Sequence, residues 1–124
     1  MRVYRVEAPG NNKGAYAHPF AYAYPFEYMG EDADWSWYDR MCRKHMGSDH
    51  PDPYEDGMDY ATSWDYRFGF PSMQHLFRWF GGWLQHLLDA GQKVSVYEVE
   101  ERFVATGKSG RQVAFNLERA TRIK

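Results

Sequence analysis

Residues with metal-ligand chemistry gather in the first half of the chain. Cys42 and His45 would share one helical turn, and Asp49 and His50 follow them closely. Thiolate and imidazole together suit zinc, but a structural zinc site normally brings a second pair of ligands, which this sequence does not display. A partly buried cysteine beside solvated loop residues is therefore the favoured interpretation, and we predict no metal site.

Charged residues within the predicted strands are a second source of chemistry. Arg5 lies in the β-prone opening Val3-Tyr4-Arg5-Val6-Glu7. A guanidinium on a central strand is unfavourable unless it binds an anion or a carboxylate, whereas on an edge strand it is ordinary surface. Glu98 and Glu100 would share one face of a later strand as paired carboxylates, although a solvated edge is the commoner explanation.

The chain divides its charge between two regions. Residues 27–65 hold eleven acidic and three basic residues, whereas residues 66–124 hold nine basic and five acidic residues. The acidic stretch is also rich in tryptophan and tyrosine. Carboxylates steer a basic partner and rings anchor it. We therefore predict a partner-binding surface that consists of Trp35, Trp37, Tyr38, Asp52, Tyr54, Glu55, Asp56, Asp59, Tyr60 and Trp64.

Length and composition bound the class of protein. The 124 residues are typical of one domain, which we place over residues 1–124. A mean hydropathy of −0.76 without a long apolar run excludes a membrane span. One cysteine, Cys42, fits a reducing cytoplasm. A net charge of −2 argues against broad nucleic-acid binding, and no direct contact with nucleic acid is expected.

Strand patterns surround a helical middle. Alternating or β-branched residues predict strands over 3–7, 66–70 and 94–100, and a hairpin whose arms are 103–106 and 112–115. The Gly107-Lys108-Ser109-Gly110 segment between those arms reads as a turn, because a phosphate loop needs different glycine spacing and a following helix.

Helical periodicity appears in two places. One helix is predicted from Trp35 to about Met46, and a second begins after Ser72, its N-cap, breaks at Gly81-Gly82 and ends near Gly91. Residues 47–65 are rich in Gly, Asp and Pro and predict a long loop. The expected fold is α+β: a small, mostly antiparallel sheet with two or three helices and a long acidic loop.

Several short segments resemble a family of small, uncharacterised proteins of tailed bacteriophages. They are the opening strand, the Phe68-Gly69-Phe70-Pro71-Ser72 step into a helix, the strand from Val94, and Gln112-Val113-Ala114-Phe115. The resemblance covers both ends and the Phe68 to Phe115 half, but not the acidic middle. It implies an accessory protein in the cytoplasm of a bacterial host cell.

The order of parts also resembles a shrunken ADP-ribosyltransferase core. That resemblance implies that Arg5 contacts NAD and that Phe68 to Ser72 forms the second motif of the site. Gln112 stands where the family has its catalytic glutamate, and a neutral amide supplies no charge to a developing cation. The ligand-binding residues of this alternative are Arg5, Ser72, Glu98 and Gln112.

Three functions remain open from the sequence. The favoured one is a phage protein that binds and inhibits a bacterial host or defence protein, as anti-CRISPR proteins do, by docking on a basic surface of that protein or of a nucleoprotein complex. It needs no cofactor. The alternative is an NAD-binding ADP-ribosyltransferase-like enzyme or its inactive relative. The third is a virion or morphogenesis component, for which homo-oligomers are expected.

Overall fold

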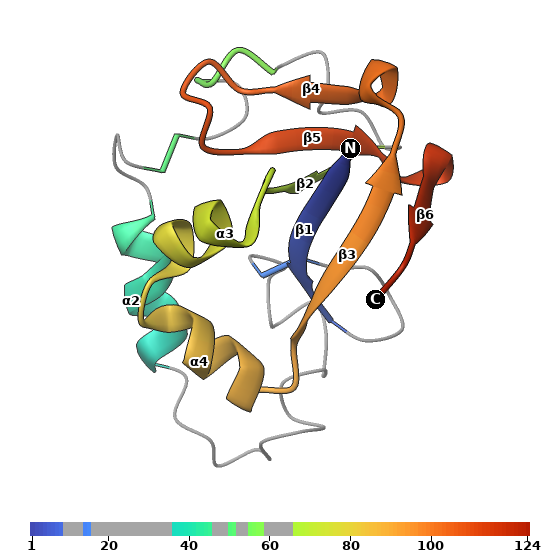
Figure 1. The fold of residues 1–124 in the computed structure, drawn as a ribbon. Helices are drawn as coiled ribbons and strands as arrows, with labels where there is room; N and C mark the ends of the chain where they lie inside the picture. Colours follow the sequence, from blue (N-terminus) through green and yellow to red (C-terminus); the bar gives the residue numbers. More distant parts are fainter. Residues whose placement is uncertain (9–13, 16–35, 46–49, 52–54, 59–65) are drawn as a thin grey trace.

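The computed structural model describes residues 1–8, 14–15, 36–45, 50–51, 55–58 and 66–124. Within these residues the chain forms strands and helices of an α+β fold, as the sequence predicts (Figure 1). The strands are β1 (Arg2–Glu7), β2 (Tyr66–Gly69), β3 (Lys93–Val99), β4 (Val104–Thr106), β5 (Val113–Asn116) and β6 (Ala120–Arg122), and the helices are α2 (Ser36–Lys44), α3 (Met73–Phe80) and α4 (Trp83–Asp89). Short 3₁₀ turns, η3 (Glu101–Phe103) and η4 (Leu117–Arg119), precede β4 and β6.

Two antiparallel sheets of three strands replace the one sheet that was expected. Sheet A has the order β1-β3-β6, and sheet B has the order β2-β5-β4. An isolated bridge between Tyr4 and Phe70 joins them, through two backbone hydrogen bonds of 2.9 and 2.8 Å. Strand β1 therefore lies at the end of sheet A, and the bridge at Tyr4 attaches its outer edge to the residue that follows β2.

Gly69 allows the two sheets to meet. A β-carbon at this position would lie 2.6 Å from the Val3 side chain and 2.8 Å from the Tyr4 carbonyl oxygen. Real β-carbons do not approach other atoms so closely, so a larger residue would push β2 away from β1. The glycine of the Phe68-Gly69-Phe70 step thus serves the junction between the sheets.

The helices cover one side of sheet A (Figure 1). Ser72 caps α3, because its side chain accepts a hydrogen bond from the His75 amide, and α3 ends at Gly81 with φ 54°. The apolar stripes of the helices pack against Val6 in one core cluster, whose large members are Trp37, Met41, Phe70, Leu76, Trp79, Phe80, Leu84 and Leu87.

Alternation along β1 directs its other side chains to a second core. Val3 packs with Tyr97 and Val99 of β3 and with Val113 and Phe115 of β5. Val3, Arg5 and Glu7 alternate with Tyr4 and Val6, so the charged pair faces away from the helices. Strand β6 was not predicted, because Ala120–Arg122 is short and largely exposed and carries no alternating apolar pattern.

Candidate functional site

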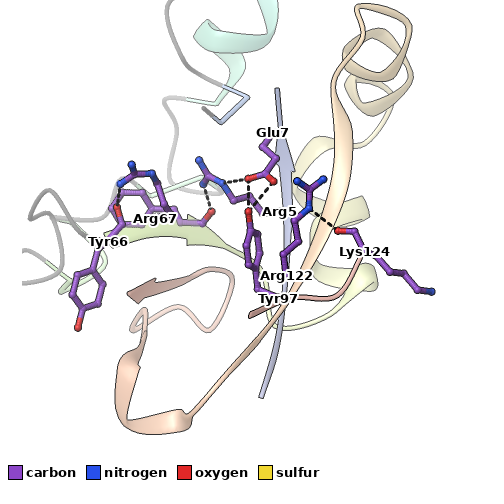
Figure 2. A network of polar contacts seen from close by, with 8 residues as sticks. Arg5, Glu7, Tyr66, Arg67, Tyr97, Arg122 and Lys124 are labelled. Atoms are coloured by element: carbon purple, nitrogen blue, oxygen red, sulfur yellow. Dashed lines mark hydrogen bonds and ion pairs between the residues drawn. The ribbon is translucent and has the colours of Figure 1, made fainter. Parts of the chain in front are cut away.

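A buried polar cluster lies on β1 and β3, beside the junction of the sheets (Figure 2). Arg5 Nε donates to Glu7 Oε2 at 3.1 Å, and Arg5 NH1 donates to the Phe68 carbonyl oxygen of β2 at 2.6 Å. The Tyr97 hydroxyl donates to Glu7 Oε1 at 2.8 Å. Arg5 is 6% exposed and Glu7 is 0% exposed. The carboxylate that a buried guanidinium requires is therefore supplied by the chain itself.

Further polar groups share this face of the sheet. Ser95 lies opposite Arg5 in the β1–β3 ladder, and among the residues that the structure describes its buried hydroxyl has no hydrogen-bond partner. Arg67 is close enough to Arg5 to influence its ionisation. Figure 2 shows Arg67 and Arg122 on either side of the cluster, each donating to a backbone oxygen. The face thus combines one carboxylate with several guanidinium groups.

Burial dominates the ionisation of this cluster. Desolvation lowers the pKa of the Arg5 guanidinium, and the nearby Glu7 carboxylate acts in the opposite direction. Burial and the hydrogen bond to Glu7 raise the pKa of the Tyr97 hydroxyl to about 12. At neutral pH the Tyr97 hydroxyl therefore keeps its proton and donates a hydrogen bond that holds the Glu7 side chain in place.

A second buried carboxylate, Asp56, lies on the side of sheet B. Its Oδ1 accepts from the Ser109 amide at 2.7 Å, and its Oδ2 accepts from the Ser109 hydroxyl at 2.9 Å. Gln112 Nε2 donates to the Pro51 carbonyl oxygen at 2.6 Å and to Asp56 Oδ2 at 3.2 Å. Pro51 and Asp56 are thereby held against the turn between β4 and β5.

The four residues of the NAD alternative take part in four different sets of contacts. Arg5 binds Glu7, and Gln112 binds Pro51 and Asp56. Ser72 Oγ lies 2.6 Å from His75 Nδ1, within the N-terminal turn of α3. Glu98 is exposed and pairs with the N-terminal amino group at 3.4 Å. Among the described residues, these hydrogen bonds and ion pairs do not bring the four side chains together as one site.

Two residues of the predicted partner surface require correction. Trp37 is 6% exposed and stacks on His86 of α4, with ring centroids 5.1 Å apart. Asp56 is 3% exposed because it binds Ser109 and Gln112. Burying a ring and satisfying a carboxylate internally both stabilise the fold, so neither side chain is presented outward as a contact.

The other members of that surface divide into two groups. Glu55 is exposed, and Tyr38 is half-buried with its hydroxyl donating to the Ala15 carbonyl oxygen at 3.0 Å. The remaining predicted contacts fall outside the described residues, namely Trp35, Asp52, Tyr54, Asp59, Tyr60 and Trp64.

The histidines considered for a metal site form a ring stack. His45 and His50 lie 4.0 Å apart between ring centroids with an interplanar angle of 16°, and His50 Nε2 lies 2.7 Å from the Trp79 carbonyl oxygen. Burial, with a contribution from His50, lowers the pKa of His45 to about 4. Within the described ranges, which exclude Asp49, no group of three or more candidate ligands could hold a metal ion.

Sequence reasoning missed Glu7, Tyr97 and Ser109 as members of the polar clusters. Glu7 gave a usable signal, because it follows Arg5 by two residues and so shares a strand face with it. Ser109 gave no such signal, since its partner Asp56 lies 53 residues away in the sequence.

Within the described residues, no helix is long and apolar enough to cross a membrane.

Comparison with known proteins identifies a phage family. No curated protein and no solved structure matches the chain. The model of one protein family, described as bacteriophage T4 Y00F protein, matches residues 1–124, including the acidic middle that the sequence resemblance left out. The chain belongs to the bacteriophage T4 Y00F protein family.

Proposed function

We propose that this phage protein binds a basic surface of a bacterial host or defence protein and inhibits it. The observation that carries the proposal is the concentration of eleven acidic residues in residues 27–65. Such a density of carboxylates steers association with a basic partner and disfavours acidic ones. The activity is one of occupancy, as in anti-CRISPR and other anti-defence proteins, and requires no cofactor.

The described part of the acidic segment supports this proposal with a revised set of contacts. Asp56 is fixed to the β4–β5 turn, and its neighbour Glu55 is exposed. A buried, satisfied carboxylate gives a fixed point from which adjacent acidic side chains can be presented. We therefore assign Asp52, Glu55 and Asp59 as contact residues, with Asp56 as their anchor.

A pull-down from a bacterial host lysate tests the proposal. The tagged wild-type chain should retain a basic host protein at low salt and release it at high salt, because exposed charges are screened. A variant with Asp52, Glu55 and Asp59 changed to lysine should retain none. Asp56 is left intact, since replacing it would disturb the fold as well as the charge.

The matched control reverses three acidic residues elsewhere. Glu100, Glu101 and Glu118 are exposed, so changing them to lysine alters the net charge by the same amount without burying a charge. This control should retain the host protein almost as wild type does. Equal loss in both variants would show that net charge alone matters, and undiminished binding by the first variant would refute the acidic surface.

The alternative function, binding of NAD or a related dinucleotide, gains one specific observation. Arg5 of β1 and Ser95 of β3 lie opposite each other, and the buried Ser95 hydroxyl has no hydrogen-bond partner among the described residues. Arg67 adds positive charge nearby. Such a face suits a phosphate-bearing ligand. Transfer of ADP-ribose is not expected, because Gln112 at the glutamate position is neutral and donates to Pro51 and Asp56.

Thermal unfolding in millimolar NAD tests this alternative. Binding to the native state should raise the Tm in proportion to the logarithm of the NAD concentration. Arg5→Lys, which keeps a cation beside Glu7 but loses the forked donor geometry, should abolish the shift. No Tm shift in the wild-type chain ends the alternative, and it leaves the host-binding proposal untouched.

A further inference from the structure

We infer that Asp56 and the β4–β5 turn form a latch that holds Pro51 and residues 55–58, so that Gly107, Ser109 and Gln112 are positioning residues for partner binding. This inference rests on the proposed function. It assigns a role in recognition to uncharged residues about fifty positions away from the acidic segment in the sequence. None of the three has to touch the partner.

The latch is built from complementary donors and acceptors. The two carboxylate oxygens of Asp56 accept hydrogen bonds from the Ser109 backbone amide, from the Ser109 hydroxyl and from the side-chain amide of Gln112. The backbone adds a further hydrogen bond, from the Lys108 amide to the Asp56 carbonyl oxygen at 2.9 Å. Gln112 also donates to the Pro51 carbonyl oxygen. The segment is thus held at both Pro51 and Asp56 by a single turn.

Glycines make the close approach of the two segments feasible. A β-carbon at Gly107 would collide with Asp56 Oδ2. On the opposite side of the contact, Gly57 has φ 80°, and a β-carbon there would lie 2.7 Å from the Lys108 side chain. The two segments therefore approach closely only because glycine occupies both positions. An alanine at position 107 has to displace the Asp56 carboxylate.

Neutral hydrogen-bond donors, rather than cations, hold the Asp56 carboxylate in the latch. Among the described residues, no lysine or arginine forms an ion pair with Asp56, so its donors are neutral. Neutral donors in a turn fix a carboxylate by direction, since the Ser109 amide cannot reorient without moving the hairpin.

A second set of contacts holds His50, the residue that precedes Pro51. His50 lies 2.7 Å from the Trp79 carbonyl oxygen of α3 and stacks on His45, which directly follows α2. His50 is therefore joined to the helices, whereas Pro51 and Asp56 are joined to sheet B. Release of the latch frees the Asp56 end while the His50 end stays in place.

Hydrogen exchange on the full chain tests whether the latch exists. Gly107→Ala and Ser109→Ala should accelerate exchange at residues 55–58 and at Ser109, while β1 and β3 keep their protection. Gly82→Ala introduces the same methyl group at an exposed position with no atom within 4 Å, and should behave as wild type. Ser109→Thr keeps both donors and should restore protection.

Affinity for the host protein recovered in the pull-down tests the positioning role. The two latch variants should bind it about tenfold more weakly, because the segment must be ordered on binding, whereas Ser109→Thr and Gly82→Ala should match wild type. Unchanged exchange in the latch variants, or faster exchange with undiminished affinity, overturns the inference. Failure of the lysine substitutions at Asp52, Glu55 and Asp59 to affect binding would instead overturn the proposed function, and would leave the exchange result standing.

Discussion

The two buried carboxylates of this protein, Glu7 and Asp56, are satisfied in opposite ways. Glu7 receives a guanidinium and a phenol, from Arg5 and Tyr97, at the junction of the two sheets. Asp56 receives an amide, a hydroxyl and a carboxamide, from Ser109 and Gln112, at the edge of sheet B. The first is an ion pair within the core, and the second is a loop held by directional neutral donors.

This difference separates the part of the molecule that maintains the fold from the part that presents a surface. A buried ion pair mainly penalises the loss of either partner, because the remaining charge is left without compensation. A loop fixed by neutral donors can be released while the sheets stay folded. We therefore expect substitutions around Glu7 to change global stability most, and substitutions around Asp56 that introduce no charge to change mainly the local order of Pro51 and residues 55–58.

Removal of the Arg5 cation should have the largest effect. Arg5→Met leaves Glu7 charged and buried, and the free energy of unfolding in urea should fall by about 3–5 kcal/mol. The double variant Arg5→Met, Glu7→Leu removes both charges and should recover most of that loss. A double variant as unstable as the single one would mean that packing, and not the orphaned charge, accounts for the effect.

The glutamate that the transferase resemblance places at position 112 should be unfavourable here. Gln112→Glu removes the donor to the Pro51 carbonyl oxygen and sets a second carboxylate beside Asp56, so stability at neutral pH should fall by about 2–3 kcal/mol. The loss should diminish as the pH is lowered and one carboxylate is protonated. Gln112→Met, which lacks the charge, should show no such pH dependence in urea unfolding.

Loss of the Tyr97 hydroxyl should lower the free energy of unfolding less than the substitutions at Arg5 and Gln112. Tyr97→Phe removes one donor to Glu7 while Arg5 remains, so the expected loss is about 1–2 kcal/mol in the same unfolding measurement. In the folded wild-type chain the pKa of this hydroxyl is raised to about 12, so a phenolate absorbance step near that pH should disappear in the variant. Loss of a phenolate step near the ordinary pKa of 10 instead would contradict the buried contact with Glu7.

Protonation of His45 should have the smallest effect. Its folded pKa, about 4, lies below the ordinary value of 6.5, so the unfolded chain takes up the proton first as the pH falls. The contribution is fully present above pH 6.5 and is lost between 6.5 and about 4. His45→Gln should flatten the dependence of Tm on pH across that window, and an identical slope in both proteins would argue against the stacked pair.

Local patterns predicted the elements better than their pairing. The N-cap at Ser72, the break at Gly81-Gly82 and the β4–β5 hairpin follow from nearby residues and are confirmed. The division into two sheets depends on the approach of β2 to β1 at Gly69, across more than sixty residues. Residue type alone does not encode such long-range contacts.

The candidate site was predictable to a lesser degree. The burial of Arg5 depended on the approach of β2 to the outer edge of β1, and its internal partner Glu7 supplies the carboxylate that a buried guanidinium needs. Asp56 and Trp37 look like surface residues in a polar, acidic stretch. They are buried because Asp56 meets a turn, and Trp37 a helix, that are distant in sequence.

The central claim, that Asp52, Glu55 and Asp59 bind the host protein while Asp56 only anchors them, is tested most directly by one titration series. Affinity for the recovered host protein is measured for wild type, for Asp56→Asn, and for the variant with lysine at positions 52, 55 and 59. The account predicts partial weakening with a retained salt dependence for Asp56→Asn, and loss of both binding and salt dependence for the lysine variant. Complete loss in Asp56→Asn with near-normal binding by the lysine variant would contradict it.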